Sequence, residues 1–319
     1  FPKKDRAFAT SLFNAGASVG ALAAPATIPL LAEHYGWEMA FIIIGALGFI
    51  WMFFWVFLYD KPEKSKFVNK SELIYINQDD EDAVATSEVK EEKTIPFLKC
   101  FTYRQTWAFI TGKFFTDGVW WFFLFWAPAY FSDQYGYKSS DGMGIALIIT
   151  LYAIVTIISI YGGYLPKIFV DKKGMNPYAG RMLAMLIFAF FPLAALFAQP
   201  LGQYSAWWPA IIIGLAGAGH QAWSANLFST IGDMFPKSTI ATITGIGGMA
   251  GGVGSFIINK GAGNFFTWAE AQGANFTFLG FEGKPASYMI VFCVCAVAYL
   301  LAWSIMKTLV PKYKPIIVE

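Results

Sequence analysis

Residues 235–254 read FPKSTIATITGIGGMAGGVG, and this stretch decides which kind of protein the chain forms. Within it, residues 245–250 satisfy the G-x-G-x-x-A pattern of a dinucleotide-binding turn. That pattern binds phosphate only where a strand precedes it and a soluble helix follows. Here a proline turn takes the place of the strand, and an apolar run continues to residue 263. We therefore predict a membrane helix, in which Gly247, Gly251 and Gly254 let a neighbouring helix approach closely.

The composition of the whole chain supports a membrane environment. Of its 319 residues, 56% are hydrophobic, 18% are aromatic and only 14% are charged, whereas soluble domains have about 25% charged residues. A compact soluble protein needs a mostly polar surface, so we expect lipid to cover much of this chain. The net charge of +2 gives no indication of a nucleic-acid partner.

The three cysteines indicate neither a disulfide framework nor a metal site. Cys293 and Cys295 lie two apart in an apolar run, and Cys100 stands alone. This spacing fits no zinc-ligand pattern, so we expect all three to be packing residues. We predict no metal and no cofactor.

Eight apolar stretches are long enough to cross the hydrocarbon core, which takes roughly 20 residues of helix. They cover residues 10–31, 39–59, 106–130, 143–165, 179–199, 207–229, 240–263 and 286–306. Lysine and arginine are retained in cytoplasmic loops. If the start of the chain is cytoplasmic, all but four of its 23 basic residues fall in cytoplasmic segments, the exceptions being Lys113, Lys138, Lys260 and Lys284. We expect a multi-pass protein with both ends of the chain in the cytoplasm.

An internal repeat indicates how these helices are grouped. Residues 1–20, FPKKDRAFATSLFNAGASVG, align with residues 235–254, and the two copies are six spans apart. Repeats of six helices in the same orientation relate the halves of major-facilitator proteins. We predict an all-α integral membrane protein with the major-facilitator fold, comprising the C-terminal eight of twelve transmembrane helices.

The repeat also predicts the domain boundaries. Residues 1–60 are expected to be the last two helices of the N-terminal half, whose first four helices would precede residue 1. Residues 61–104 form a cytoplasmic linker, and residues 105–319 form the C-terminal six-helix half. The acidic run QDDEDAVATSEVKEEK within the linker, residues 78–93, is expected to be solvated.

Two ionisable residues lie inside the third span, where a charge costs about 2.5–3.5 kcal/mol on insertion scales. Lys113 and Asp117 are four residues apart and therefore share one helical face. Two interpretations remain open. They form a permanent structural salt bridge, or they face the transport pathway, where Lys113 binds an anionic substrate and Asp117 takes part in proton coupling or gating.

Aromatic and polar residues supply the remaining candidates for substrate binding. Trp120 and Trp121 follow Asp117 in the same span, and core packing or an interfacial aromatic belt explains them equally well. Asn14, in the first span, is a further candidate.

The sixth span places four hydrogen-bonding side chains within seven residues. Of these, His220 and Trp223 share one face, whereas Asn226 lies further round the helix. Gln221 is the fourth. A single buried histidine is usually a satisfied packing residue, but four polar groups in one span favour a substrate site.

Four segments carry a family resemblance: FPKKDRAFATSLFNAGASVGA (1–21), TDGVWWFFLFWAPAYF (116–131), GGYLPKIFVDKKGMNPYAGR (162–181) and HQAWSANLFSTIGDMFP (220–236). They resemble the anion:cation symporter family of the major facilitator superfamily, and are similar to bacterial hexuronate transporters. The resemblance implies proton-coupled import of galacturonate or glucuronate across the bacterial inner membrane by alternating access, with sodium as the alternative coupling ion. It also implies that the decisive charged residues lie mainly on the first and fourth helices, and that the C-terminal half contacts sugar hydroxyls through residues such as Gln221, Trp223 and Asn226.

Other functions are weighed against this one. A carrier of another organic anion, such as galactonate, glucarate or tartrate, is the alternative within transporters, and a membrane sensor that does not transport is a second. An enzyme would need a nucleophile, a metal set or an acid/base pair. The chain has only His34 and His220, with no Cys, His and Asp grouping at ligand spacing. We therefore predict that it is not an enzyme.

Overall fold

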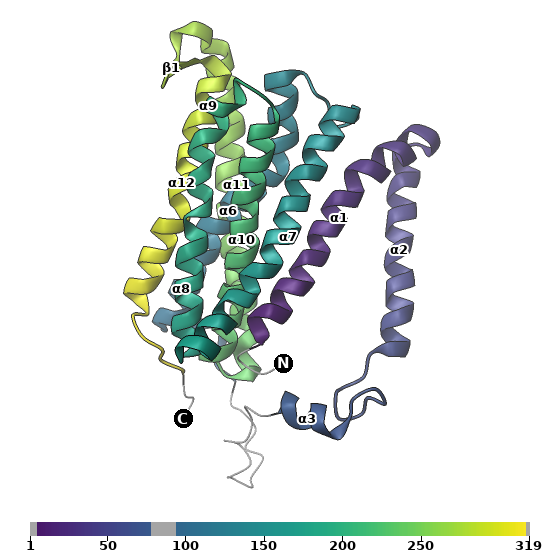
Figure 1. Cartoon of the computed structure of the whole chain (residues 1–319), viewed down its shortest axis with the longest axis vertical. Coiled ribbons are helices and arrows are strands. Elements are labelled where there is room, and N and C mark those ends of the chain that lie inside the picture. Colours follow the sequence, from purple (N-terminus) through teal and green to yellow (C-terminus); the bar gives the residue numbers. More distant parts are fainter. Residues whose placement is uncertain (1–4, 78–93, 317–319) are drawn as a thin grey trace.

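The computed structural model describes residues 5–77 and 94–316, which are almost entirely helical (Figure 1). The acidic run 78–93, predicted to be a solvated linker, lies outside the described residues, as do residues 1–4 and 317–319. The side chain of Asn14 is also outside the description.

The elements follow the apolar stretches of the sequence closely. In chain order they are α1 (Arg6–Tyr35), α2 (Trp37–Leu58), α3 (Lys70–Ile76), α5 (Phe97–Cys100), α6 (Arg104–Tyr135), α7 (Gly142–Lys173), α8 (Pro177–Ala189), the 3-10 helix η1 (Phe191–Phe197), α9 (Ala198–Gly202), α10 (Trp207–Met234), η2 (Lys237–Thr239), α11 (Ile240–Gln272), η3 (Gly273–Asn275), β1 (Thr277–Phe278), β2 (Phe281–Glu282) and α12 (Gly283–Leu309).

Five segments of the described chain are helical, long and apolar enough to cross a membrane. They are Trp37–Leu58, Gly142–Lys173, Pro177–Gly202, Lys237–Asn275 and Gly283–Leu309. The chain is therefore a multi-pass, all-α membrane protein, as the composition predicts.

The span predicted as one helix over residues 179–199 is interrupted. After α8 ends at Ala189, the chain continues as the 3-10 helix Phe191–Phe197 before α9 begins. Pro192 stands at the start of the 3-10 segment. A proline lacks the N–H group and clashes with the preceding turn, so it breaks the α-helical ladder at this point.

The loop predicted after residue 263 begins later than expected. Helix α11 continues to Gln272, and the following residues form a two-stranded antiparallel hairpin in which Phe278 pairs with Phe281. Leu279 and Gly280 have φ values of 50° and 83°, as a tight hairpin turn requires. Phe276 of this loop packs against Phe265 of α11, and Phe281 packs with Ala286 of α12, contacts that hydropathy alone does not predict.

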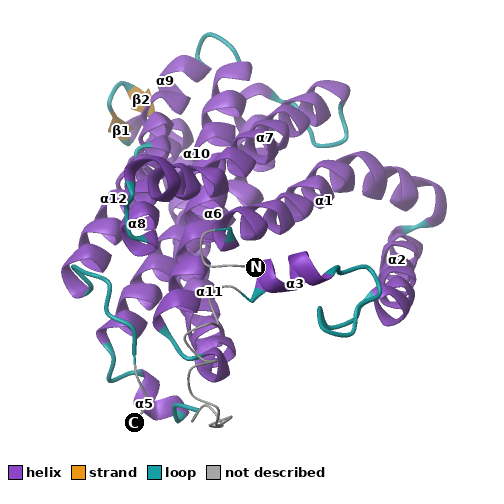
Figure 2. Cartoon of the chain, turned by 60° about the horizontal axis from the view of Figure 1, so that its bottom comes forward, coloured by secondary structure: helices purple, strands orange, loops and turns teal. Residues whose placement is uncertain are grey.

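Helix α10 is the central helix of the bundle formed by α6 to α12. It packs against α6, α7, α8 and η1, and most of its residues are buried. Helix α1 lies along α7, and α2 stands apart from the bundle with α1 as its neighbour (Figures 1 and 2). Phe41, Phe49 and Phe57 of α2 are 74%, 71% and 71% exposed. Such aromatic exposure is suited to lipid or to further helices, not to water.

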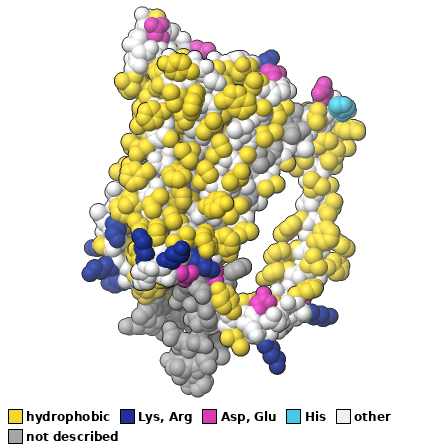
Figure 3. All heavy atoms as spheres, viewed as in Figure 1, with side chains coloured by type: hydrophobic (Ala, Val, Ile, Leu, Met, Phe, Trp, Pro, Cys, Tyr) yellow, Lys and Arg dark blue, Asp and Glu magenta, His cyan; other side chains and the backbone are white. Residues whose placement is uncertain are grey.

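The two ends of the bundle differ in charge. We call the end where α7 and α12 finish the basic end, because Lys172, Lys173 and Lys307 lie in the last turns of these helices. In Figure 3 most of the visible lysine and arginine side chains gather at this end, and hydrophobic side chains cover the surface above them. The apolar zone between the two ends is the zone expected to face lipid.

The glycines of the opening stretch pack α11 against α6, as the sequence predicts. A methyl group added to Gly247 would overlap the ring of Phe109, and one added to Gly254 would lie 3.0 Å from the carbonyl carbon of Phe114. At Gly248, on another face of α11, an added methyl group meets no atom within 4 Å. The interpretation as a helix-packing stripe is confirmed, and the dinucleotide-loop interpretation is excluded, because these residues are helical throughout.

Candidate functional site

Lys113 and Asp117 form an ion pair in the middle of α6. Lys113 Nζ lies 2.6 Å from Asp117 Oδ2, and the two residues are 7% and 8% exposed. Lys113 Nζ is also 4.8 Å from the ring centre of Phe228 on α10. Asp117 lies against Gly251 of α11, where an added methyl group would be 2.9 Å from its Cγ. The pair therefore occupies the junction of α6, α10 and α11, and the predicted shared face is confirmed.

The second carboxylate oxygen of Asp117 accepts no hydrogen bond from the described residues. Oδ1 is buried and has no hydrogen-bond partner among the described residues. A buried polar atom without a partner costs about 1–3 kcal/mol. Because Lys113 satisfies only one oxygen, the site has hydrogen-bonding capacity that the described protein groups leave open.

His220 belongs to a hydrogen-bonded chain that joins three helices. Its ring stacks on Trp120 of α6 at 5.1 Å with an interplanar angle of 5°. His220 Nδ1 lies 2.8 Å from the hydroxyl of Tyr299 on α12, and that hydroxyl donates to the carbonyl of Thr116 at 3.1 Å. A hydroxyl carries one hydrogen, so Nδ1 of His220 is the donor in their shared bond. The imidazole thus has a structural partner and also presents its face to Trp120.

Trp223 and Asn226 lie on different sides of α10. Trp223 is 0% exposed, and its ring meets Tyr299 edge-on at 5.6 Å. Asn226 Nδ2 donates to the carbonyl of Ala222 at 2.8 Å and lies 3.5 Å from the carbonyl of Gly162 on α7. The structure therefore brings His220, Trp223 and Trp120 together and separates Asn226 from them, as its position further round the helix predicts.

Two of these side chains also have unused hydrogen-bonding atoms. Trp223 Nε1 and Asn226 Oδ1 are buried without a partner among the described residues. Gln221, next to His220, is buried as well. Trp121, by contrast, is half-buried and stacks on Phe125 of its own helix at 5.5 Å. Its ring contact lies within α6, so Trp121 is not part of the cluster around His220.

A polar contact between α6 and α11 is absent from the sequence prediction. Trp126 Nε1 donates to Asn259 Oδ1 at 3.0 Å, and Asn259 Nδ2 donates to the carbonyl of Ser255 at 2.9 Å. An asparagine in the span 240–263 is a usable signal, since amides are rare among lipid-facing residues. Tyr299 is also missing from the prediction, and a tyrosine in an apolar helix gives no comparable signal.

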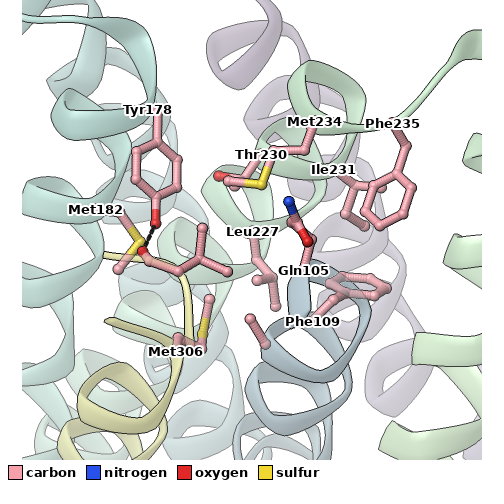
Figure 4. Close-up of a pocket in the computed structure, with 12 residues that line it drawn as sticks. Gln105, Phe109, Tyr178, Met182, Leu227, Thr230, Ile231, Met234, Phe235 and Met306 are labelled. Carbon is pink, nitrogen blue, oxygen red and sulfur yellow. Dashed lines mark hydrogen bonds between the residues drawn. The ribbon is translucent and has the colours of Figure 1, made fainter. Parts of the chain in front are cut away.

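An apolar pocket lies between α6, α8, α10 and α12 toward the basic end (Figure 4). Its lining is mostly apolar and includes the three methionines Met182, Met234 and Met306. The hydroxyl of Tyr178 donates to the carbonyl of Val310 beside it. Such a lining is typical of side-chain packing and offers few polar groups to bind a polyhydroxylated anion. The Lys113 and Asp117 pair lies further along α6 and does not line this pocket.

Ion pairs also join the helices at both ends of the bundle. At the basic end, Lys167 of α7 lies 2.5 Å from Asp5, which precedes α1 and also accepts a hydrogen bond from Tyr75 of α3. At the opposite end, Lys284 of α12 lies 2.9 Å from Asp133 of α6. Among the described residues, no group of three His, Cys, Asp or Glu side chains is arranged to hold a metal ion.

Comparison with known proteins identifies related transporters. The chain is 30% identical over 251 residues to the hexuronate transporter of Escherichia coli (strain K12), a match that covers 78% of the chain and 56% of that protein. It is 28% identical over 187 residues to the galacturonate transporter of Dickeya chrysanthemi, covering 59% of the chain and 53% of that protein. The D-galactonate transporter of Escherichia coli O6:H1 is 24% identical over 264 residues, covering 81% of the chain and 60% of that protein.

The chain thus spans about half the length of the curated relatives that it matches. These relatives are transporters by name, in agreement with the prediction that the chain is not an enzyme. Residues 1–258 match the family described as the Major Facilitator Superfamily. With most of its length matched and its helices arranged as a bundle, this chain belongs to the Major Facilitator Superfamily.

Proposed function

We propose that this chain is part of a secondary carrier that imports a hexuronate, galacturonate or glucuronate, together with a proton. The observation that carries the proposal is the buried Lys113 and Asp117 pair at the junction of three helices, with one carboxylate oxygen left without a partner. The similarity to hexuronate and galacturonate transporters supports the choice of substrate.

In this proposal the chain comprises the last eight of twelve transmembrane helices. Residues 1–60 belong to the N-terminal half, residues 61–104 link the halves on the cytoplasmic side, and residues 105–319 form the C-terminal half. The repeat of residues 1–20 at 235–254 supports this division. So does the packing of α6 to α12 as one bundle, beside which α1 and α2 stand. Both ends of the chain are then cytoplasmic, because basic residues are retained on that side.

The ion pair suggests how substrate and proton are coupled. The carboxylate of the sugar acid accepts hydrogen bonds from Lys113 and so replaces Asp117 as its partner. Asp117, left without its cation in an apolar surrounding, then takes up a proton, because an isolated buried carboxylate is strongly disfavoured. Release of the substrate and the proton to the cytoplasm re-forms the pair.

The sugar hydroxyls need donors and acceptors that the protein does not already satisfy. Trp223 Nε1 and Asn226 Oδ1 have this capacity, and Gln221 and His220 lie beside them on α10. These side chains are buried in the present conformation, so they reach substrate only when the helices move during alternating access. Trp120 and Trp121 on α6 and Asn14 on α1 complete the proposed binding residues.

Uptake of labelled galacturonate and glucuronate tests the proposal. The complete carrier containing this chain is expressed in cells that lack their own carrier, with and without a protonophore. We expect uptake that collapses with the proton gradient and is lost in Asp117→Asn. The control Glu63→Gln removes an exposed carboxylate of the linker and should transport normally. No uptake by carrier shown to reach the membrane would sink the assignment.

The similarity to a D-galactonate transporter favours an aldonate as the second candidate substrate. Competition by unlabelled galactonate, glucarate and tartrate in the same cells separates these sugar acids. If galactonate competes at lower concentrations than galacturonate, the substrate is an aldonate. If none of these anions is transported or competes, a sensor that binds without transport becomes the better assignment.

A further inference from the structure

A polar groove at the basic end lies away from the proposed transport site. It has a volume of about 520 Å³ and runs between residues 102–105, at the start of α6, and residues 309–316, which follow α12. Lys113 is nine residues beyond Arg104 on α6, or about 13 Å at 1.5 Å per residue. The proposed substrate contacts do not use this groove.

The segment after α12 is held in place as one wall of the groove. Gln105 Nε2 donates to the carbonyl of Lys314 at 2.8 Å. The backbone N–H of Ile316 donates to the carbonyl of Met234 at 2.8 Å, and the hydroxyl of Tyr313 donates to the carbonyl of Asp233 at 3.1 Å. These bonds attach the segment to α6 and α10, so the groove is part of the folded structure.

Three cationic side chains line this groove. Arg104 comes from α6, and Lys312 and Lys314 come from the opposite wall. All three are exposed, and none is among the ion pairs formed between the described residues. The groove therefore concentrates positive charge that no described carboxylate neutralises.

Part of the lining is apolar, and its position at the end of α12 relates the groove to the membrane surface. Leu309, Val310 and Ile316 line the same groove, and α12, one of the segments able to cross a membrane, ends at Leu309. A site at the end of such a helix lies at the level of lipid headgroups. Cations beside an apolar wall at that level match a phosphate joined to a glycerol backbone better than a freely soluble anion.

We propose that this groove binds the phosphate headgroup of an anionic phospholipid from the leaflet at the basic end. Arg104, Lys312 and Lys314 contact the phosphate, and the aliphatic wall contacts the glycerol region. Each lysine or arginine at an anionic lipid surface contributes to the affinity for that lipid. Removing all three should therefore weaken lipid binding on the order of 100-fold. The inference depends on the membrane location and not on transport of any sugar acid.

Native mass spectrometry and thermal unfolding of the complete carrier in detergent test this proposal. Phosphatidylglycerol and phosphatidylcholine are titrated into the wild type, into Arg104→Gln/Lys312→Gln/Lys314→Gln, and into the control Lys61→Gln/Lys64→Gln/Lys66→Gln. The control removes three exposed lysines of the linker, outside the groove. We expect phosphatidylglycerol, but not phosphatidylcholine, to bind to the wild type and to raise its Tm. Only the groove variant should lose this binding and this rise in Tm.

Three results would overturn the proposal. If both triple variants lose phosphatidylglycerol binding equally, the lipid is attracted by charge without a specific site. If the wild type binds phosphatidylcholine as well as phosphatidylglycerol, the aliphatic wall alone retains lipid. Inorganic phosphate that stabilises the carrier and displaces phosphatidylglycerol would assign the groove to a soluble anion. If the triple variant does not fold, the single exposed change Lys312→Gln replaces it, and unchanged phosphatidylglycerol binding there would also contradict the assignment.

Discussion

Replacing Gly254 by alanine tests the contact between α11 and α6 on which the candidate site depends. The added methyl group would lie 3.0 Å from the carbonyl carbon of Phe114, 3.3 Å from its Cα, and closer still to its oxygen. These atoms belong to the backbone and cannot rotate away, so the two helices must separate. Overpacking of this kind costs about 1–3 kcal/mol.

The higher helix propensity of alanine opposes this cost. A second glycine-to-alanine variant gains the same propensity, so comparing the two variants cancels the propensity effect. Alanine is favoured over glycine in a helix by about 1 kcal/mol. Gly252→Ala gains the same preference at a position of α11 where an added methyl group meets no atom within 4 Å. The difference between the two variants therefore isolates the overpacking term, about 1–3 kcal/mol in favour of Gly252→Ala.

Thermal unfolding of the purified carrier in detergent, at one scan rate, measures this difference. For a unit of about 150–250 residues, the size class of the bundle α6 to α12, 1 kcal/mol corresponds to about 2–4 °C. The Tm of Gly254→Ala should therefore lie roughly 2–12 °C below that of Gly252→Ala. Equal Tm values for the two variants would refute the close approach of α11 to Phe114. The position of Asp117 against the neighbouring Gly251 would then need another explanation.

Three further predictions follow from single contacts. Asp233→Asn removes the carboxylate charge from the buried pair with Arg181, the side chains of Asp233 and Arg181 being 3% and 2% exposed. The change should cost about 1.5–3 kcal/mol of stability, and a Tm equal to that of wild type would contradict this. Tyr299→Phe removes the partner of His220 Nδ1 and should cost about 1–3 kcal/mol, a loss that Tyr204→Phe, an exposed hydroxyl control, should not show. Burial raises the pKa of the Cys100 thiol, so the thiol is protonated at neutral pH. Its labelling by maleimide should therefore be slow, and the labelling rate should still rise with pH where the rate of an exposed thiol has levelled off. Fast labelling at pH 7 in the folded carrier would contradict this, because it would show that the thiol is accessible.

Local features of the candidate site were predictable, and contacts between helices were not. The Lys113 and Asp117 pair depends only on a spacing of four residues within one helix. The bond from His220 to Tyr299 spans 79 residues, and the bond from Trp126 to Asn259 spans 133. Such partners depend on which helices are neighbours and how each is rotated about its axis, and a hydropathy pattern specifies neither.

By itself, the sequence determined the membrane class, the approximate bounds of the helices and the packing role of Gly247, Gly251 and Gly254. Hydropathy, helical period and small side chains act over a few turns, so a single stretch such as residues 235–254 is sufficient to predict them. Only the tertiary structure decided that Trp120 stacks on His220, that Asn226 faces α7, and that the chain after α12 folds back beside Arg104. These arrangements result from close packing among helices far apart in sequence, because a buried side chain adopts the position that its neighbours leave open.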